Sequence, residues 1–285
     1  MTPTERRRRF CAVLQGEACL HPASVFDPIS ARIAQDLGFE LAMMAGSVAS
    51  MTVLGAPDLI VLTLTEFAEQ ARRIGRAASI PLMVDADHGY GNALNVKRTV
   101  EELENAGVAA LTIEDTDLPQ PYGATGARLI PIAEGVGKMK AALAGRSDPA
   151  LAVIGRTSAP ALAGISETVA RIRAYAAAGV DAMFLTGVRN REDLEAIAAA
   201  SPVPMLLGAS DGLDRAHMAQ NKVRIALQGH LPFAAGVQAV YDTMKALRAG
   251  TPPNRITGAA SAEMLKSATR DADYRRWTKD FLGGK

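Results

Sequence analysis

Two neighbouring apolar segments of the sequence end in acidic residues. Along Leu82–Asp87 apolar and acidic residues alternate, so that Asp85 and Asp87 share one face of an extended chain. The next apolar segment, Leu111–Glu114, ends in Glu114, which we expect at the same level. Carboxylates brought together in this way repel one another and have raised pKa values unless a cation neutralises them. Because all of these ligands are oxygens, the pattern favours Mg²⁺ or Mn²⁺ over ordinary acids that cap helices or pair with arginine.

Groups that could bind an anion follow two other apolar segments. Arg156 offers the planar, bidentate donor that a small dicarboxylate or keto acid needs, and it could also pair with Glu114 or Asp87. The hydroxyl and backbone N–H groups of Gly46-Ser47 could bind an anionic group, although a plain turn is equally compatible with the sequence.

Two further features should reach the same edge of the fold. His230 follows the last apolar segment, where it could transfer a proton, bind substrate or serve a structural role. Residues 115–128, DTDLPQPYGATGAR, form a long connection with two prolines and two glycines. A connection of this length at the catalytic face is typical of a lid that closes over substrate.

The elements that must position these residues alternate between short apolar segments and stretches with helical spacing. This order predicts a parallel sheet, and eight segments without a switch point favour a closed (β/α)8 TIM barrel. We expect one barrel domain over residues 1–250, with an N-terminal helix, and a C-terminal helical extension over 251–285. In such a barrel the active site lies at the C-terminal ends of the strands. The expected strands are Ala18–His21, Leu41–Met44, Leu82–Asp85, Leu111–Glu114, Ala152–Thr157, Ala182–Thr186, Met205–Leu207 and Arg224–Leu227.

The composition narrows the class of protein. Hydrophobic residues make up 48% of the 285 residues and charged residues 21%, which is typical of a globular chain. The 31 Lys and Arg residues nearly balance the 30 Asp and Glu residues, so we expect no nucleic-acid or membrane partner. We interpret the basic run Arg6–Arg9 as the solvated face of an amphipathic helix. Without a long apolar window, a signal peptide or enough cysteines for a disulfide framework, we expect a cytoplasmic protein.

The sequence resembles the isocitrate lyase and phosphoenolpyruvate mutase superfamily from about Phe26 to Gly250. The matching segments are Gly46-Ser47, LGAPDLIVLTLTEFAEQARRI (54–74), VDADHGYGN (84–92), IED (113–115) and GRTSA (155–159). The resemblance implies a Mg²⁺-dependent barrel that acts on α-keto or α-hydroxy carboxylates. It also implies a homotetramer in which the helix after the last strand is exchanged between neighbouring subunits.

The resemblance assigns roles residue by residue. Asp85 matches the direct metal ligand, and Arg156 matches the substrate arginine. The acids that match holders of the metal's water shell are Asp58, Asp87 and Glu114, and the residues that match the substrate carboxylate site are Gly46 and Ser47.

Departures from the superfamily's patterns select the reaction. The lid has neither the Cys and His of the carbon–carbon lyases nor the Asn of the phosphonate branch, and Ser158 stands where the superfamily has Asp. With His230 after the last strand, the sequence most resembles the oxaloacetate decarboxylase branch. This resemblance implies Mg²⁺-dependent decarboxylation of oxaloacetate, a small α-keto dicarboxylate, to pyruvate and CO₂, with the leaving carboxylate near His230. A methylisocitrate-type lyase or phosphonopyruvate hydrolase using Tyr122 as its acid, and a non-catalytic keto-acid-binding barrel, are the alternatives.

Overall fold

The chain forms two compact units. The computed structural model describes residues 1–208 and 212–283, and it divides the chain into Met1–His230 and Leu231–Lys285. The sequence predicts a boundary after residue 250, whereas the structure assigns the helix after the last strand, α11 (Leu231–Arg248), to the second unit. The second unit also contains the 3-10 helix η1 (Pro253–Arg255), α12 (Ala262–Thr269) and α13 (Asp271–Leu282). Residues 284–285 of the predicted extension lie outside the described residues.

The first unit is a (β/α)8 barrel, as predicted. Its strands are parallel and pair in chain order, and a single parallel bridge from Leu20 to Ile225 joins the last strand to the segment before the first. The strands in the described chain are β1 (Ala23–Ser24), β2 (Ala42–Met44), β3 (Leu82–Asp85), β4 (Ala110–Glu114), β5 (Ala152–Thr157), β6 (Ala182–Leu185), β7 (Met205–Leu207) and β8 (Val223–Ala226).

The expectation that Ala18–His21 forms the first strand is wrong. The hydrogen bonds to β2 are donated by the backbone N–H groups of Ala23 and Val25, which lie beyond Pro22. Proline has no N–H group to contribute to such a ladder. Leu20 contributes only the closing bridge to β8.

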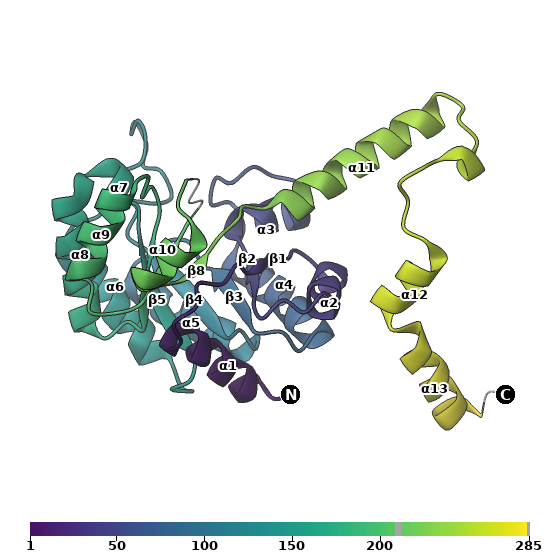
Figure 1. The fold of residues 1–285 in the computed structure, drawn as a ribbon, viewed down its shortest axis with the longest axis horizontal. Coiled ribbons are helices and arrows are strands. Elements are labelled where there is room, and N and C mark those ends of the chain that lie inside the picture. The colour runs from purple at the N-terminus through teal and green to yellow at the C-terminus, as the bar shows by residue number, and fades with distance from the viewer. Residues whose placement is uncertain (209–211, 284–285) are drawn as a thin grey trace. The chain divides into compact units, whose positions relative to one another are not determined.

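Helices surround the strands of this unit, with α2–α4 on one side and α7–α9 on the other in Figure 1. The capping box predicted at Thr63 is present, since Glu66 N–H donates to the Thr63 hydroxyl and the Glu66 carboxylate accepts from Thr63 N–H. The helices of this unit are α1 (Pro3–Gln15), α2 (Pro28–Asp36), α3 (Gly46–Leu54), α4 (Leu64–Ala77), α5 (Ala93–Asn105), α6 (Ile132–Gly145), α7 (Ala159–Leu162), α8 (Gly164–Ala178), α9 (Arg191–Ala200) and α10 (Arg215–Gln220).

The alternation along β3 decides which side chains reach the catalytic mouth. Leu82 and Val84 are buried in the apolar layer between sheet and helices, together with Val96 and Val100 of α5. Successive strand residues point to opposite faces, so Asp85 points into the barrel. The same alternation on β4 directs Glu114 inward.

The predicted solvated basic face of α1 is wrong for two of its four arginines. Arg6 and Arg7 are buried, whereas Arg8 and Arg9 are exposed. The Arg7 guanidinium lies 2.8 Å from the carboxylate of Asp148, and it donates to the carbonyl oxygens of Val108 and Glu104. Arg6 and Arg7 therefore fasten α1 to the rest of the first unit.

Across the described helices, none has both the length and the apolar composition that crossing a membrane requires.

Candidate active site

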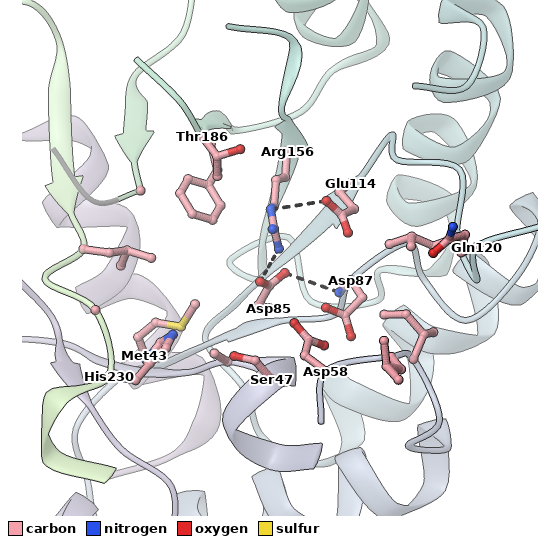
Figure 2. A pocket seen from close by; sticks show the side chains of 18 residues that line it. Met43, Ser47, Asp58, Asp85, Asp87, Glu114, Gln120, Arg156, Thr186 and His230 are labelled. Atoms are coloured by element: carbon pink, nitrogen blue, oxygen red, sulfur yellow. Dashed lines mark hydrogen bonds and ion pairs between the residues drawn. The ribbon is translucent and has the colours of Figure 1, made fainter. Parts of the chain in front are cut away.

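Four acidic side chains and one arginine line a single cavity of about 450 Å³ in the first unit. In Figure 2 Arg156 lies at the centre of the site, with the acids beside and below it. The acids are Asp58 from the loop before α4, Asp85 at the end of β3, Asp87 from the loop that follows, and Glu114 at the end of β4. The structure thus brings together all four acids that the sequence proposes as metal site residues.

Asp85 lies at the centre of this set. It is buried, and its Oδ1 accepts a hydrogen bond of 2.7 Å from the hydroxyl of Thr112, its register partner on β4. The guanidinium of Arg156 donates to its other carboxylate oxygen. Both carboxylate oxygens are therefore oriented by side chains of β4 and β5, which fixes the position of the proposed metal ligand.

Asp87 occupies a turn that holds its carboxylate against the start of α3. Its φ is 48°, a left-handed conformation that is uncommon outside glycine, and its carbonyl accepts a 2.8 Å hydrogen bond from Glu114 N–H. A β-carbon at Gly46 would lie 2.5 Å from Asp87 Oδ2. Gly46 is therefore required for the approach of Asp87, while Ser47, the next residue of α3, lines the cavity.

Arg156 forms ion pairs with acids of the site. The sequence suggests such pairing as well as substrate binding. It pairs with Asp85, and its Nε lies 3.5 Å from Glu114 Oε2. Its guanidinium carbon lies 5.4 Å from the ring centroid of Phe184, within the range of a cation–π interaction. Since the guanidinium also lines the cavity, these contacts position it without removing it from reach of a ligand.

The site carries more negative charge than Arg156 can neutralise. Burial, and then the charges of Asp85 and Glu114, raise the pKa of Asp87 well above its ordinary value. Burial also raises the pKa of Glu114, with Arg156 opposing it, and burial followed by Asp85 raises the pKa of Asp58. Desolvated carboxylates that share one guanidinium are stabilised by an added cation.

The four acids offer carboxylate oxygens to one cavity. Among residues 1–208 and 212–283, no group of three or more acidic, histidine or cysteine side chains is arranged to hold one ion together. Mg²⁺ often binds through one or two carboxylates with several retained waters. The oxygen donors of the four carboxylates are therefore the kind that suits Mg²⁺ or Mn²⁺.

His230 lines the same cavity, where the sequence expects it. Its Nδ1 lies 2.9 Å from the hydroxyl of Ser24 at the end of β1. Burial lowers the pKa of His230, and the charges of Asp85 and Asp58 oppose that shift. We did not expect the contribution of Ser24 from the sequence, although its position at the end of a strand is a signal for the catalytic face.

The lid contributes Leu118 and Gln120 to the described cavity, and Figure 2 shows Gln120 at the edge of the acidic side. Its base is a narrow hairpin, closed by the antiparallel bridge between Thr116 and Leu129. Tyr122 is fully exposed and does not line the cavity.

The wall opposite the acids was not predicted as part of the site. It includes Phe184 and Thr186 on β6 and just beyond it, with Gly208 after β7. Thr186 is the last residue of an expected strand, so the sequence predicts its place at the catalytic face. A threonine by itself, however, does not indicate chemistry.

Comparison with known proteins identifies similar chains over the whole length. The sequence pattern of the phosphoenolpyruvate phosphomutase family matches residues 10–248. The oxaloacetate decarboxylase of Rhodopseudomonas palustris (strain BisB18) is 55% identical over 287 aligned residues, covering 100% of both chains. The oxaloacetate decarboxylase of Bradyrhizobium diazoefficiens is also 55% identical, covering 98% of both chains.

Solved structures share the fold at lower sequence identity. Oxaloacetate acetylhydrolase in complex with 3,3-difluorooxalacetate has a TM-score of 0.87 and 27% identity, covering 100% of this chain and 99% of that one. Phosphonopyruvate hydrolase in complex with oxalate and Mg²⁺ has a TM-score of 0.85 and 28% identity, covering 99% of this chain and 100% of that one.

Proposed function

Because the chain belongs to the phosphoenolpyruvate phosphomutase family, we propose that it is an enzyme of that family that decarboxylates oxaloacetate to pyruvate and CO₂. The observation that carries this choice is the composition of the cavity. The described part of the lid supplies an apolar and an amide side chain, Leu118 and Gln120, and no acid. Decarboxylation of a β-keto acid needs no acid on the lid, because CO₂ leaves without accepting a proton.

We place a divalent cation, Mg²⁺ or Mn²⁺, at Asp85. Asp58, Asp87 and Glu114 line the same cavity and would hold its waters. When bound, the cation polarises the 2-keto group and stabilises the negative charge that develops on its oxygen. The presence of Mg²⁺ in the phosphonopyruvate hydrolase structure supports this assignment.

The protein's own side chains bind and orient the substrate. Ser47, at the start of α3, binds the C1 carboxylate through its hydroxyl, and the N-terminus of the helix favours negative charge there. Arg156, held in place by Asp85 and Glu114, donates to the keto-acid end of the substrate. The C3–C4 bond then breaks, its electron pair forms the C2–C3 double bond of the enolate, and a proton returns to C3. His230 faces the departing carboxylate from the other wall.

The alternative hypothesis, a carbon–carbon lyase, depends on an acid in the lid. Tyr122 is the lid residue that the sequence offers for this role, and its side chain lies outside the cavity. This position favours the decarboxylase over a carbon–carbon lyase. A non-catalytic keto-acid-binding barrel has no need for four acids around one arginine.

The test is an assay of the purified protein with Mg²⁺ against oxaloacetate, methylisocitrate and phosphonopyruvate. Pyruvate release is measured in each case, and the rate with Mg²⁺ alone is subtracted because the free ion also decarboxylates oxaloacetate. We expect turnover of oxaloacetate, loss of activity on chelation and recovery with Mg²⁺ or Mn²⁺. Turnover of another substrate in the panel, without turnover of oxaloacetate, would refute the proposal.

We further propose a cytoplasmic homotetramer in which α11 is exchanged between subunits. The helix buries none of its side chains, and its exposed apolar residues include Val237, Val240, Tyr241 and Met244. Exposed apolar surface of this kind commonly marks an association site. Free Cys11 and Cys19 fit a reducing compartment. Light scattering of the wild-type protein should give a tetramer mass, and Tyr241→Asp combined with Met244→Asp should reduce that mass.

A further inference from the structure

The cavity has two chemically different walls. The four carboxylates and Arg156 belong to the loops and strands between α3 and β5, whereas the described lining residues of β6, β7 and their turns are Phe184, Thr186 and Gly208. Figure 2 shows Thr186 on the side of Arg156 away from Asp58 and Asp87, and His230 low in the view beside Met43. Phe184, Thr186 and Gly208 carry no charge themselves, and the Arg156 guanidinium lies 5.4 Å from the Phe184 ring centroid.

Thr186 is held in one orientation on this wall. Its hydroxyl lies 2.7 Å from the hydroxyl of Ser158, which follows β5. A β-carbon at Gly208 would lie 3.3 Å from the Thr186 methyl carbon, so the methyl group packs against the end of β7. With its methyl group packed toward Gly208 and its oxygen toward Ser158, Thr186 cannot turn without losing one of these contacts.

The paired hydroxyls can present one donor to the cavity. Each hydroxyl has a single proton and two lone pairs. When Ser158 donates to Thr186, the proton of Thr186 is free to donate to a ligand, and the two hydrogen bonds reinforce each other. Ser158 does not line the cavity itself, so it acts through Thr186.

A leaving carboxylate needs a neutral partner of this kind. CO₂ carries no charge, so a cationic partner would stabilise the carboxylate far more than the departing product and would slow the bond cleavage. A hydroxyl has no net charge, so its hydrogen bond to the carboxylate lacks the Coulomb attraction that a cation adds. A single hydroxyl can fix the orientation of the C3–C4 bond without this penalty.

We propose that Thr186, positioned by Ser158, binds the departing C4 carboxylate of the substrate, and that the uncharged wall around it determines that this group leaves as CO₂. This inference rests on the proposed decarboxylation and assigns its leaving-group subsite. Phe184, two residues before Thr186, lines the same wall. The keto-acid end of the substrate stays with Asp85, Ser47 and Arg156.

The experiment compares oxaloacetate turnover with inhibition by oxalate, using the full-length protein with saturating Mg²⁺. Oxalate resembles the keto-acid end of the substrate and has no group corresponding to C4. Thr186→Val keeps the shape and removes the hydroxyl, Thr186→Ser keeps the hydroxyl, and Ser158→Asp places a carboxylate against Thr186. Thr65→Val is the matched control, because Thr65 is exposed on α4 and does not line the cavity.

We expect Thr186→Val to lower kcat/KM for oxaloacetate about tenfold or more, the size of one hydrogen bond to a charged group. Ser158→Asp should lower it further, roughly a hundredfold, because its carboxylate accepts the hydrogen bond of the Thr186 hydroxyl and repels the leaving group. Thr186→Ser should recover most of the activity lost in Thr186→Val. The inhibition constant of oxalate should stay within about twofold throughout, and Thr65→Val should match the wild type.

The possible failures are distinguishable. If the wild-type protein does not decarboxylate oxaloacetate, the proposed function fails and this subsite fails with it. If the wild-type protein is active and Thr186→Val or Ser158→Asp retains full kcat/KM, the subsite alone is refuted. A parallel loss of oxalate binding would also refute it, since Thr186 would then act on the keto-acid end or on the fold.

Discussion

Gly46 and Asp87 lie so close that a β-carbon at position 46 would stand 2.5 Å from Asp87 Oδ2. The contact joins the start of α3 to the loop after β3, two segments that are far apart in the sequence. It brings a half-buried carboxylate to a helix N-terminus, where backbone N–H groups favour negative charge.

Gly46→Ala should therefore displace Asp87. Because Asp87 is one of the acids around the proposed metal position, we expect the Mg²⁺ concentration for half-maximal activity to rise at least tenfold. Titration of activity with Mg²⁺ measures this effect, and Gly55→Ala, at a site with no atom within 4 Å of the added carbon, is a control for the loss of a glycine. Because Gly55 has a φ of 64°, some loss of stability in the control is expected, but no change in Mg²⁺ dependence. An unchanged Mg²⁺ titration for Gly46→Ala would remove Asp87 from the metal site.

Asp85→Ala should abolish metal-dependent turnover, because it removes the proposed direct ligand. The fold should remain intact, since Arg156 retains Glu114 as a partner and the excess negative charge of the site is reduced. Circular dichroism reports the fold, and pyruvate release at increasing Mg²⁺ reports the activity. Near-normal turnover at saturating Mg²⁺ would show that the cation binds elsewhere. Asp85→Asn, which keeps the shape of the side chain, separates loss of charge from loss of packing.

Tyr122→Phe should change kcat by less than about twofold, because the exposed phenol lies outside the cavity and decarboxylation requires no acid there. Steady-state kinetics with oxaloacetate measure this directly. A loss of several hundredfold in kcat, with unchanged substrate binding, would instead favour a lyase in which the lid closes and brings Tyr122 to the substrate.

The parts of the fold that the sequence predicts are those encoded by local periodicity. β3 and β4 are recognisable because each is an apolar run ending in an acid, and their register places Asp85 beside Thr112, two residues before Glu114. β1 is only two residues long and follows Pro22, so neither alternation nor length distinguishes it from a loop. The hydrogen bond between Ser24 and His230 joins residues 206 positions apart, which one sequence alone does not reveal.

The sequence does not indicate the uncharged wall, for a different reason. Thr186 and Phe184 are ordinary strand residues, and their position opposite four acids becomes apparent only when the barrel closes. The sequence is compatible with both ion pairing and substrate binding for Arg156, and the structure shows its pairing with Asp85 and Glu114. Charged residues at strand ends are therefore predictable from sequence, while neutral residues that shape the same cavity are not.

The last prediction concerns His230, whose imidazole lines the cavity and contacts the Ser24 hydroxyl at 2.9 Å. Burial lowers its pKa, and a bound cation would lower the pKa further, so the neutral imidazole is the form present at neutral pH. If the neutral form is required, kcat/KM should fall as the pH drops through a value below the ordinary pKa of about 6.5. His230→Gln should remove this acidic limb, lower kcat/KM for oxaloacetate about 10²-fold or more, and leave the Mg²⁺ titration unchanged. Ser24→Ala, which removes the hydroxyl partner, should shift the limb without abolishing it. A His230→Gln variant with wild-type kcat/KM and the same pH profile would show that the histidine is structural and that the enolate receives its proton from another group.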